Sequence, residues 1–342
     1  MSPALRLLGG LKGILRSDAL NRLPHALNQE KLAVLCYHGV VPERLPPGHP
    51  QHPLTIAVDD FAEQLRFLRR WFHPVTASAV CDHYVNGEPL PRHALLVTFD
   101  DGYRNNLTLA APLLEKYGIP AIVFIATGYI GARRFYWYDE LLRRLAVWTD
   151  ESVLIPGGAE TRPWPRDEAA RRGLAREIEA AAKRVPNDVR LEYLDYLRQR
   201  TPWWSLDGPE RDMITPMTWD EVRALARRGF EIGSHTVEHP ILSRLAPDAL
   251  RTELHQSRER LEEVTGRSCF AISYPNGSLA DISPAVIAAT EAAGYQLGFT
   301  MTERLQPREG SRFLLARVSA PGHAPLGVLR VRASGLKELF PG

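Results

Sequence analysis

The stretch HALLVTFDDGY at residues 93–103 decides the fold class. It begins as an apolar run and turns polar at two adjacent aspartates, Asp100 and Asp101. A continuous apolar run of this length indicates a strand that is buried on both faces. We therefore predict a buried strand that ends at paired carboxylates, which are costly to bury without a cation or a hydrogen-bonding partner.

The same pattern recurs along much of the chain. Apolar runs that end in polar residues are KLAVLCYHGV at 31–40, IPAIVFIATGYI at 119–130, FEIGSHT at 230–236, CFAISYPNG at 269–277 and YQLGFT at 295–300. Helical patterns lie between them, at 61–72, 106–117, 221–229 and 284–294. This alternation predicts a parallel sheet covered by helices. Active sites in such folds form at the carboxyl ends of the strands.

A block from about 131 to 215 breaks this rhythm. It is rich in Arg, Glu, Ala and Trp, with helical patterns at 167–184 and 188–200. We interpret it as a helical insertion between two strands of one domain. Aromatic residues cluster in it at 135–138 and 203–204. We expect them to pack the core of the insertion, and the alternative is that they stack on sugar rings.

The composition excludes several classes of protein. The 342 residues are 44% hydrophobic and 24% charged, with a net charge of +2. These values are typical of a globular protein and favour no nucleic-acid partner. Cys36, Cys81 and Cys269 are odd in number and widely spaced. We therefore expect buried or free thiols in a reducing compartment, without disulfides or a thiolate zinc site.

Residues 1–30 form an N-terminal arm with an amphipathic pattern. Leu5 and Leu8 recur near helical spacing, with Arg6 and Lys12 among the leucines. We expect this helix to pack on its own domain, and the alternative is a weak contact with a membrane surface. The two cations interrupt any run long enough for a signal peptide. We therefore expect a cytoplasmic protein, peripheral at the inner membrane if the arm contacts lipid.

Two motifs at strand ends carry the chemistry. TFDDGY at 98–103 supplies two carboxylates, and SHTVEH at 234–239 supplies two histidines four residues apart, which can reach one ion. Together they offer the two imidazoles and one carboxylate of an open catalytic zinc site. Taken singly, an Asp-Asp pair is usually a helix cap, and two histidines at this spacing are often incidental. Their joint occurrence at strand ends indicates a metal centre.

These motifs resemble those of the polysaccharide deacetylases with a NodB-homology domain, carbohydrate esterase family 4. MTWDEVRALARRGFEIGSHTVEHPILSRL at 217–245 and FAISYPNGS at 270–278 strengthen the resemblance, which covers roughly residues 31–130 and 216–320. It implies a distorted parallel (β/α) barrel of about seven strands, with residues 31–335 as the deacetylase domain and the block at 131–215 as its insertion.

The resemblance also implies roles for single residues. Asp100 would be the general base, and Asp101, His235 and His239 would bind a divalent metal, most simply zinc, with cobalt or nickel also suited to these ligands. Such an ion lowers the pKa of bound water toward about 7 and polarises the amide carbonyl. A nearby carboxylate can then accept the proton of the water.

A turn and a histidine complete the implied site. Asn276, in the Pro-Asn-Gly turn, aligns with the family's backbone donor to the oxyanion, and the alternative is a plain turn. Family members carry an Arg before this turn that pairs with the base, whereas this chain has Ser273. Some members have a circularly permuted order and also lack that Arg. For this reason we assign the general acid to His38, which ends the first strand, and keep His323 as the alternative.

The roles of two further residues stay open at this point. We expect Asp281 to cap the helix that begins after Ser283, and the alternative is that it orients an active-site group. Arg317 lies in a predicted strand and is either an active-site cation or part of a structural ion pair.

The sequence thus predicts a metal-dependent hydrolase that removes N-acetyl groups from the amino sugars of a saccharide, in envelope or exopolysaccharide biosynthesis. The alternatives are a saccharide-binding protein without activity on the same barrel, and an esterase or amidase with another acyl substrate.

Overall fold

The computed structural model describes residues 25–132 and 134–336. The expected helix at the start of the N-terminal arm lies outside these residues. Strand β5 (Ala94–Phe99), which was expected from the apolar run at 93–103, is buried along its whole length. It pairs with β1 (Ala33–Tyr37) on one side and β6 (Ala121–Ile125) on the other, both in parallel.

The strands form a curled parallel sheet, as predicted. Its order is β11-β10-β9-β6-β5-β1-β12, and β4 also pairs with β5. The remaining strands of this sheet are β4 (His73–Pro74), β9 (Glu231–Ser234), β10 (Ala271–Ser273), β11 (Leu297–Phe299) and β12 (Val318–Ser319). Leu315, just before β12, forms a parallel bridge with Phe299 of β11. This bridge brings the two edges of the sheet together, so the curled sheet forms a distorted barrel.

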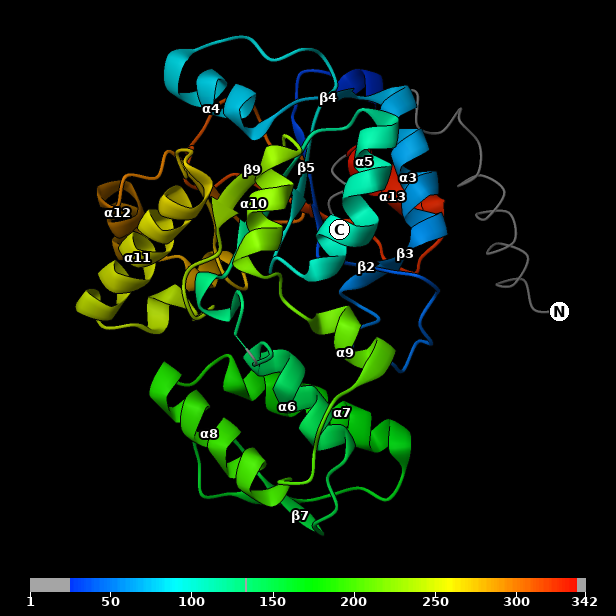
Figure 1. The fold of residues 1–342 in the computed structure, drawn as a ribbon, viewed down its shortest axis with the longest axis vertical. Helices are drawn as coiled ribbons and strands as arrows, with labels where there is room; N and C mark the ends of the chain where they lie inside the picture. The colour runs from blue at the N-terminus through cyan, green and yellow to red at the C-terminus, as the bar shows by residue number, and fades with distance from the viewer. Residues whose placement is uncertain (1–24, 133, 337–342) are drawn as a thin grey trace, which may run out of the picture.

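Helices cover the outside of the barrel (Figure 1). They are α3 (Val58–Trp71), α5 (Ala111–Tyr117), α10 (Trp219–Arg227), α11 (Pro247–Thr265), α12 (Pro284–Ala292) and α13 (Leu326–Ala333), whereas α4 (Ala77–Asn86) lies at one end of the barrel. Short 3-10 turns are η2 (Thr127–Tyr129), η3 (Leu242–Arg244) and η4 (Leu279–Asp281), and η1 (Asn106–Ala110) is a π-helical turn. A small parallel pair, β2 (Gly39–Val41) and β3 (Thr55–Ala57), lies beside the main sheet.

Alternate strand residues enter two different cores, because successive side chains of a strand point to opposite faces. Leu35, Val97 and Val123 pack against the surrounding helices. Leu96 and Ile122 pack in a second cluster with residues of α4. Burial on both faces explains why these strands are apolar throughout, and it leaves the strand ends as the place for polar residues.

The insertion contains helices α6 (Trp137–Ala146), α7 (Glu168–Ala182), α8 (Asn187–Arg200) and α9 (Gly208–Ile214). It also contains an antiparallel hairpin of β7 (Ser152–Leu154) and β8 (Thr161–Pro163), which the prediction of a helical insertion did not include. Figure 1 shows α6, α7 and α8 as a layer below the barrel. Its core includes Tyr103 and Tyr129 from the barrel, so the two parts share one apolar cluster. No described helix is long and apolar enough to cross a membrane.

Candidate metal centre and active site

The predicted site residues meet in one cavity at the carboxyl ends of the strands. Asp100 and Asp101 follow β5, His38 follows β1, and His235 follows β9. Together with His239 they line a cavity of about 310 Å³. The parallel sheet therefore brings together motifs that are more than 130 residues apart in the sequence, as expected for the carboxyl edge of a parallel barrel.

Asp101, His235 and His239 form a compact group of possible metal ligands. One ligand atom from each lies within 4.8 Å of the other two. The Nε2 atoms of both histidines lie 3.6 Å from Oδ1 of Asp101. This is longer than a good hydrogen bond. It is close to the separation of about 3.3 Å that two ligands of one tetrahedral zinc ion adopt at bond lengths of 2.0–2.1 Å.

The surroundings of these residues also fit a cation. Nδ1 of His235 lies 2.6 Å from the carbonyl oxygen of Ser273, and a proton on Nδ1 leaves the Nε2 lone pair free to bind an ion. Oδ2 of Asp101 is buried and has no hydrogen-bond partner among the described residues. Burial and the adjacent Asp100 raise the pKa of Asp101 well above its usual range. A bound cation would offset both costs.

Both histidines are suited to metal binding in their protonation state. Burial lowers the pKa of His235, and it lowers the pKa of His239 well below the ordinary value. The imidazoles are therefore neutral at pH 7, which is the form that binds metals. The loop that carries them is held by Glu253 of α11, whose carboxylate accepts the backbone N–H groups of Val237 and Glu238 at 2.7 and 3.0 Å.

Asp100 has a buried counter-ion in Arg317, the residue expected to be either an active-site cation or part of a structural ion pair. Nη1 of Arg317 donates to Oδ1 of Asp100 at 2.8 Å, and Nη2 donates to Oδ2 at 2.7 Å. Ser273 also donates to Oδ2, at 3.1 Å. Burial alone would raise the pKa of Asp100, but Arg317 outweighs burial and holds that pKa below its usual range. The Arg that is missing before the turn is thus replaced by Arg317, from the segment that leads into β12.

A second group of possible ligands lies beside the first. Atoms of Cys36, His38 and Asp100 lie within 4.8 Å of one another. Both carboxylate oxygens of Asp100 already accept hydrogen bonds from Arg317, whose fixed positive charge would repel a cation there. Of the two groups, Asp101, His235 and His239 are therefore the better site for an ion.

His38 belongs to the same cavity as the candidate metal ligands. It lines the same cavity as Asp100, and Asn106 of η1 donates to its carbonyl oxygen at 2.6 Å. Burial lowers the pKa of His38 to about 4, so the ring is neutral at pH 7. His323 instead lines a separate hollow next to Arg44, and its Nε2 lies 3.3 Å from Oγ1 of Thr55.

The Pro-Asn-Gly turn also lines the cavity, through Asn276. The φ angle of Asn276 is 62°, a left-handed conformation that is uncommon outside glycine. Its side chain donates to Asp281, which also accepts from Ser278 at 2.8 Å. The expectation that Asp281 caps the next helix was wrong. Ser283 caps α12, and the carboxylate of Asp281 is occupied in holding the turn.

Backbone strain is concentrated at this site. The described non-glycine residues with positive φ are His93, Asp101, Thr236, His239 and Asn276. All except His93 belong to the loops that line or support the cavity. Such conformations cost about 1–3 kcal/mol each and persist where the surrounding structure enforces them, often at functional sites.

Comparison with known proteins identifies the family. A family model described as polysaccharide deacetylase matches residues 87–159 and 191–298, which is more than half of the chain. The chain belongs to the polysaccharide deacetylase family.

Individual family members are distant from this chain. It is 20% identical to the Bacillus subtilis protein YxkH, assigned to the polysaccharide deacetylases, over 85% of this chain and 72% of that protein. It is 32% identical to the poly-β-1,6-N-acetyl-D-glucosamine N-deacetylase of Escherichia coli, over 21% of this chain and only 11% of that enzyme. The Streptococcus pyogenes deacetylase PplD, solved with acetate, superposes with a TM-score of 0.57 at 18% identity, covering 88% of this chain and 97% of PplD. That likeness shows the fold.

This deacetylase adds a wall to the cavity from its insertion. Trp137 and Tyr138 of α6 line the cavity and belong to the apolar core that joins insertion and barrel. The expectation that the aromatic cluster packs a core is confirmed for these two rings, which also line the cavity, and stacking on a sugar ring stays a prediction. The hydroxyl of the neighbouring Tyr136 donates to the carbonyl oxygen of Asp101.

Sequence reasoning missed the polar residues that support the site. Asp139 is buried and accepts hydrogen bonds from Tyr103, at 2.8 Å, and from Gln51. Asn106 and the adjacent Asn105 are buried at the start of the helix that follows β5. A pair of asparagines at a helix start was the available signal, although it also fits ordinary capping.

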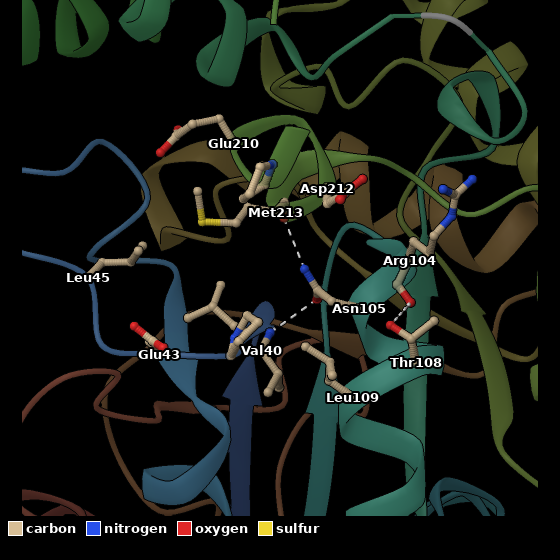
Figure 2. Close-up of a pocket in the computed structure, with 13 residues that line it drawn as sticks. Val40, Glu43, Leu45, Arg104, Asn105, Thr108, Leu109, Glu210, Asp212 and Met213 are labelled. Carbon is tan, nitrogen blue, oxygen red and sulfur yellow. Dashed lines mark hydrogen bonds between the residues drawn. The ribbon is translucent and has the colours of Figure 1, made fainter. Parts of the chain in front are cut away.

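A larger cavity of about 790 Å³ is lined in part by Val40 and Val41 of β2, the strand that follows His38. Figure 2 shows Asn105 between its walls. Asn105 accepts from the Val40 backbone N–H at 3.1 Å and donates to the Met213 carbonyl at 3.0 Å. Because its lining includes none of the candidate ligands, we assign it no catalytic role. Asn105 instead ties β2, directly after His38, to α9.

Proposed function

We propose that this deacetylase is a metal-dependent hydrolase that removes N-acetyl groups from amino-sugar residues of a saccharide. The observation that carries the proposal is the juxtaposition, in one cavity, of the Asp101–His235–His239 group with Asp100 and its counter-ion Arg317. A metal hydrolase needs both parts, which are a ligand set with open positions and a base beside it.

A divalent ion bound by Asp101, His235 and His239 would polarise the acetamide carbonyl and lower the pKa of a water molecule. Asp100, held ionised by Arg317, is placed to accept the proton of that water. The backbone N–H of Asn276, held by the strained turn, is the candidate donor to the oxyanion. His38 is neutral at rest, so it must first gain a proton before it can protonate the departing nitrogen.

The remaining alternatives differ in their support. A binding protein without activity was suggested by Ser273 in place of the family Arg. Arg317 now supplies a guanidinium on Asp100, so that reason no longer applies. Zinc is the ion that we propose, because two histidines and one carboxylate form a common catalytic zinc site, although cobalt and nickel suit these ligands too.

The proposed substrate is a saccharide with N-acetylated amino sugars. It is supported by the name of the distant E. coli relative and by the rings of Trp137 and Tyr138, which can pack against a sugar. We also propose a role in envelope or exopolysaccharide synthesis at the cytoplasmic side of the membrane. Cell fractionation that finds the untagged protein wholly outside the cytoplasm would contradict this location.

The direct test is acetate release from N-acetylglucosamine oligomers by the zinc-loaded protein. Asp100→Asn is the matched control, because it keeps the shape of the side chain and removes the base. We expect release that depends on zinc and is lost in the control. Equal release by both proteins would refute the role of Asp100, and zinc-independent release would refute the metal mechanism.

A further inference from the structure

Two charged residues at the C-terminal end of helix α7 line the catalytic cavity from the insertion. Glu179, and Lys183 directly after the last residue of α7, both line the cavity that contains Asp100 and the candidate metal ligands. They lie within residues 160–190, which separate the two segments matched by the family model. This part of the cavity wall is therefore not part of the shared family pattern, so it can distinguish the substrate of this chain from those of its relatives.

The charges on α7 form a chain of three groups. Nη1 of Arg176 lies 2.9 Å from one oxygen of Glu179, and Nζ of Lys183 lies 3.0 Å from the other. Two cations thus share one carboxylate, so the group carries a net positive charge. The Lys183 side chain is 35% exposed, whereas that of Glu179 is 14% exposed. The accessible charge of this group at the cavity is therefore the ammonium of Lys183.

The ammonium can bind a further group. It has three N–H donors, and Glu179 is its ionic partner among the described residues. On another part of the cavity wall, Glu303 follows β11 and is exposed. One of its oxygens accepts the backbone N–H of Ser319 at 3.1 Å, and within the described chain no cation pairs with it. An acidic substrate group would be repelled by Glu303 and attracted to Lys183.

We propose that Lys183 is a specificity-determining residue that binds an anionic oxygen group of the substrate while the acetamido sugar lies in the catalytic cavity. The proposal rests on the proposed deacetylase function and names the chemical class of its substrate. The anionic group is a carboxylate on a neighbouring sugar or a phosphate ester on the acetamido sugar itself. Either group offers the oxygens that a lysine ammonium binds.

The test compares acetate release from three substrates. They are a neutral N-acetylglucosamine oligomer, an oligomer of equal length that alternates N-acetylglucosamine with glucuronate, and a nucleoside-diphosphate N-acetylglucosamine. The wild-type protein should have a KM that is about tenfold lower for at least one anionic substrate than for the neutral one, as expected for one charge-assisted hydrogen bond. Which anionic substrate is preferred distinguishes the carboxylate from the phosphate.

Four variants make the test specific. Lys183→Gln should raise KM for the preferred anionic substrate about tenfold and leave kcat, and the kinetics on the neutral oligomer, unchanged. Lys183→Arg should retain most of the preference. Glu303→Gln should lower KM for the anionic substrate, the opposite sign. Lys116→Gln, at an exposed position of α5, is the matched control and should change nothing.

The result that overturns the proposal is an equal effect of Lys183→Gln on neutral and anionic substrates, or no preference in the wild type. If no substrate releases acetate, the proposed function fails. The role of Lys183 is then tested separately, by measuring the binding of substrate analogues. Calorimetry on zinc-loaded Asp100→Asn protein should show tighter binding of an anionic substrate analogue, lost in the double variant with Lys183→Gln. Equal binding by both proteins would contradict the role of Lys183.

Discussion

Two parts of the catalytic cavity are built differently. We call the candidate metal ligands and Asp100, with its counter-ion Arg317, the floor, and we call Glu179 and Lys183 of the insertion the wall. On the floor, Asp100 and Arg317 are 4% and 0% exposed, and each is held by several hydrogen bonds from different strands. On the wall, Lys183 is 35% exposed and pairs with Glu179 one turn earlier on the same chain segment. We expect a change on the floor to disturb several strands, and a change on the wall to disturb one helix. The proposed chemistry thus lies in the buried barrel, and the proposed selectivity lies in a segment outside the shared family pattern.

The largest expected effect comes from the metal ligands on the floor. Asp101→Asn should abolish acetate release and weaken zinc binding by more than about 100-fold, since even partners of metal ligands are worth 10–100-fold. Calorimetric titration with zinc measures this directly. Lys183→Gln on the wall should leave zinc affinity unchanged. Unaltered zinc binding by Asp101→Asn would mean that the ion lies elsewhere.

The ion pair below the cavity should be next in effect. Arg317→Gln leaves a buried carboxylate without its counter-ion, which typically costs about 3–5 kcal/mol of stability. Urea denaturation should show this loss, together with loss of acetate release. The double variant with Asp100→Asn should regain much of the stability, because no buried charge then remains.

Urea denaturation of a wall variant should show a much smaller loss of stability. Glu179→Gln, which removes the carboxylate shared by Arg176 and Lys183, should cost less than about 1 kcal/mol, as surface pairs usually do. A cost equal to that of Arg317→Gln would remove the distinction between floor and wall.

The turn at Asn276 should have a smaller effect. If the backbone N–H of Asn276 is what matters, Asn276→Gly should keep most of the activity, because glycine adopts the φ angle of 62° without strain. Asn276→Ala should lose about 1 kcal/mol of stability and several-fold in acetate release. Thermal unfolding and kinetics measure both. Loss of activity in the glycine variant would point to the side chain instead.

The smallest effect is expected at Asp139, and it concerns how stability depends on pH. Burial raises the pKa of Asp139 from its ordinary value of 3.8 to about 7. Between those pH values the folded protein holds a proton that the unfolded chain has released, so the contribution of Asp139 to stability falls as pH rises from about 4 through 7. The free energy of unfolding of the metal-free protein, measured by urea denaturation, should decrease from pH 5 to pH 8. The decrease should be smaller for Asp139→Asn than for the wild type. An identical decrease would contradict this assignment.

The barrel could be predicted from the sequence because its strands are buried on both faces. Each apolar run ended where polar residues began, so the runs at 31–40, 93–103 and 230–236 gave both the strands and the edge where the site lies. The convergence of Asp101 with the two histidines followed from that topology. Their roles as metal ligands remain a prediction.

The parts that could not be predicted depend on contacts between distant segments. Arg317 is 217 residues from Asp100 in sequence, and nothing near either residue indicates their pairing. The hydrogen bond from Asn276 to Asp281 was missed because an Asp before Ser-Pro is also typical of a helix cap. The insertion was recognised as helical, but a helical pattern does not show which side chains of α7 face a cavity formed by another part of the chain.

The most direct test of this account is the position of the metal. Anomalous diffraction at the zinc edge from crystals of the zinc-loaded protein distinguishes the two candidate groups of ligands. We expect one ion at about 2.0–2.2 Å from Asp101, His235 and His239, with Arg317 still paired to Asp100. An ion bound by Cys36, His38 and Asp100, with Arg317 displaced, would contradict it.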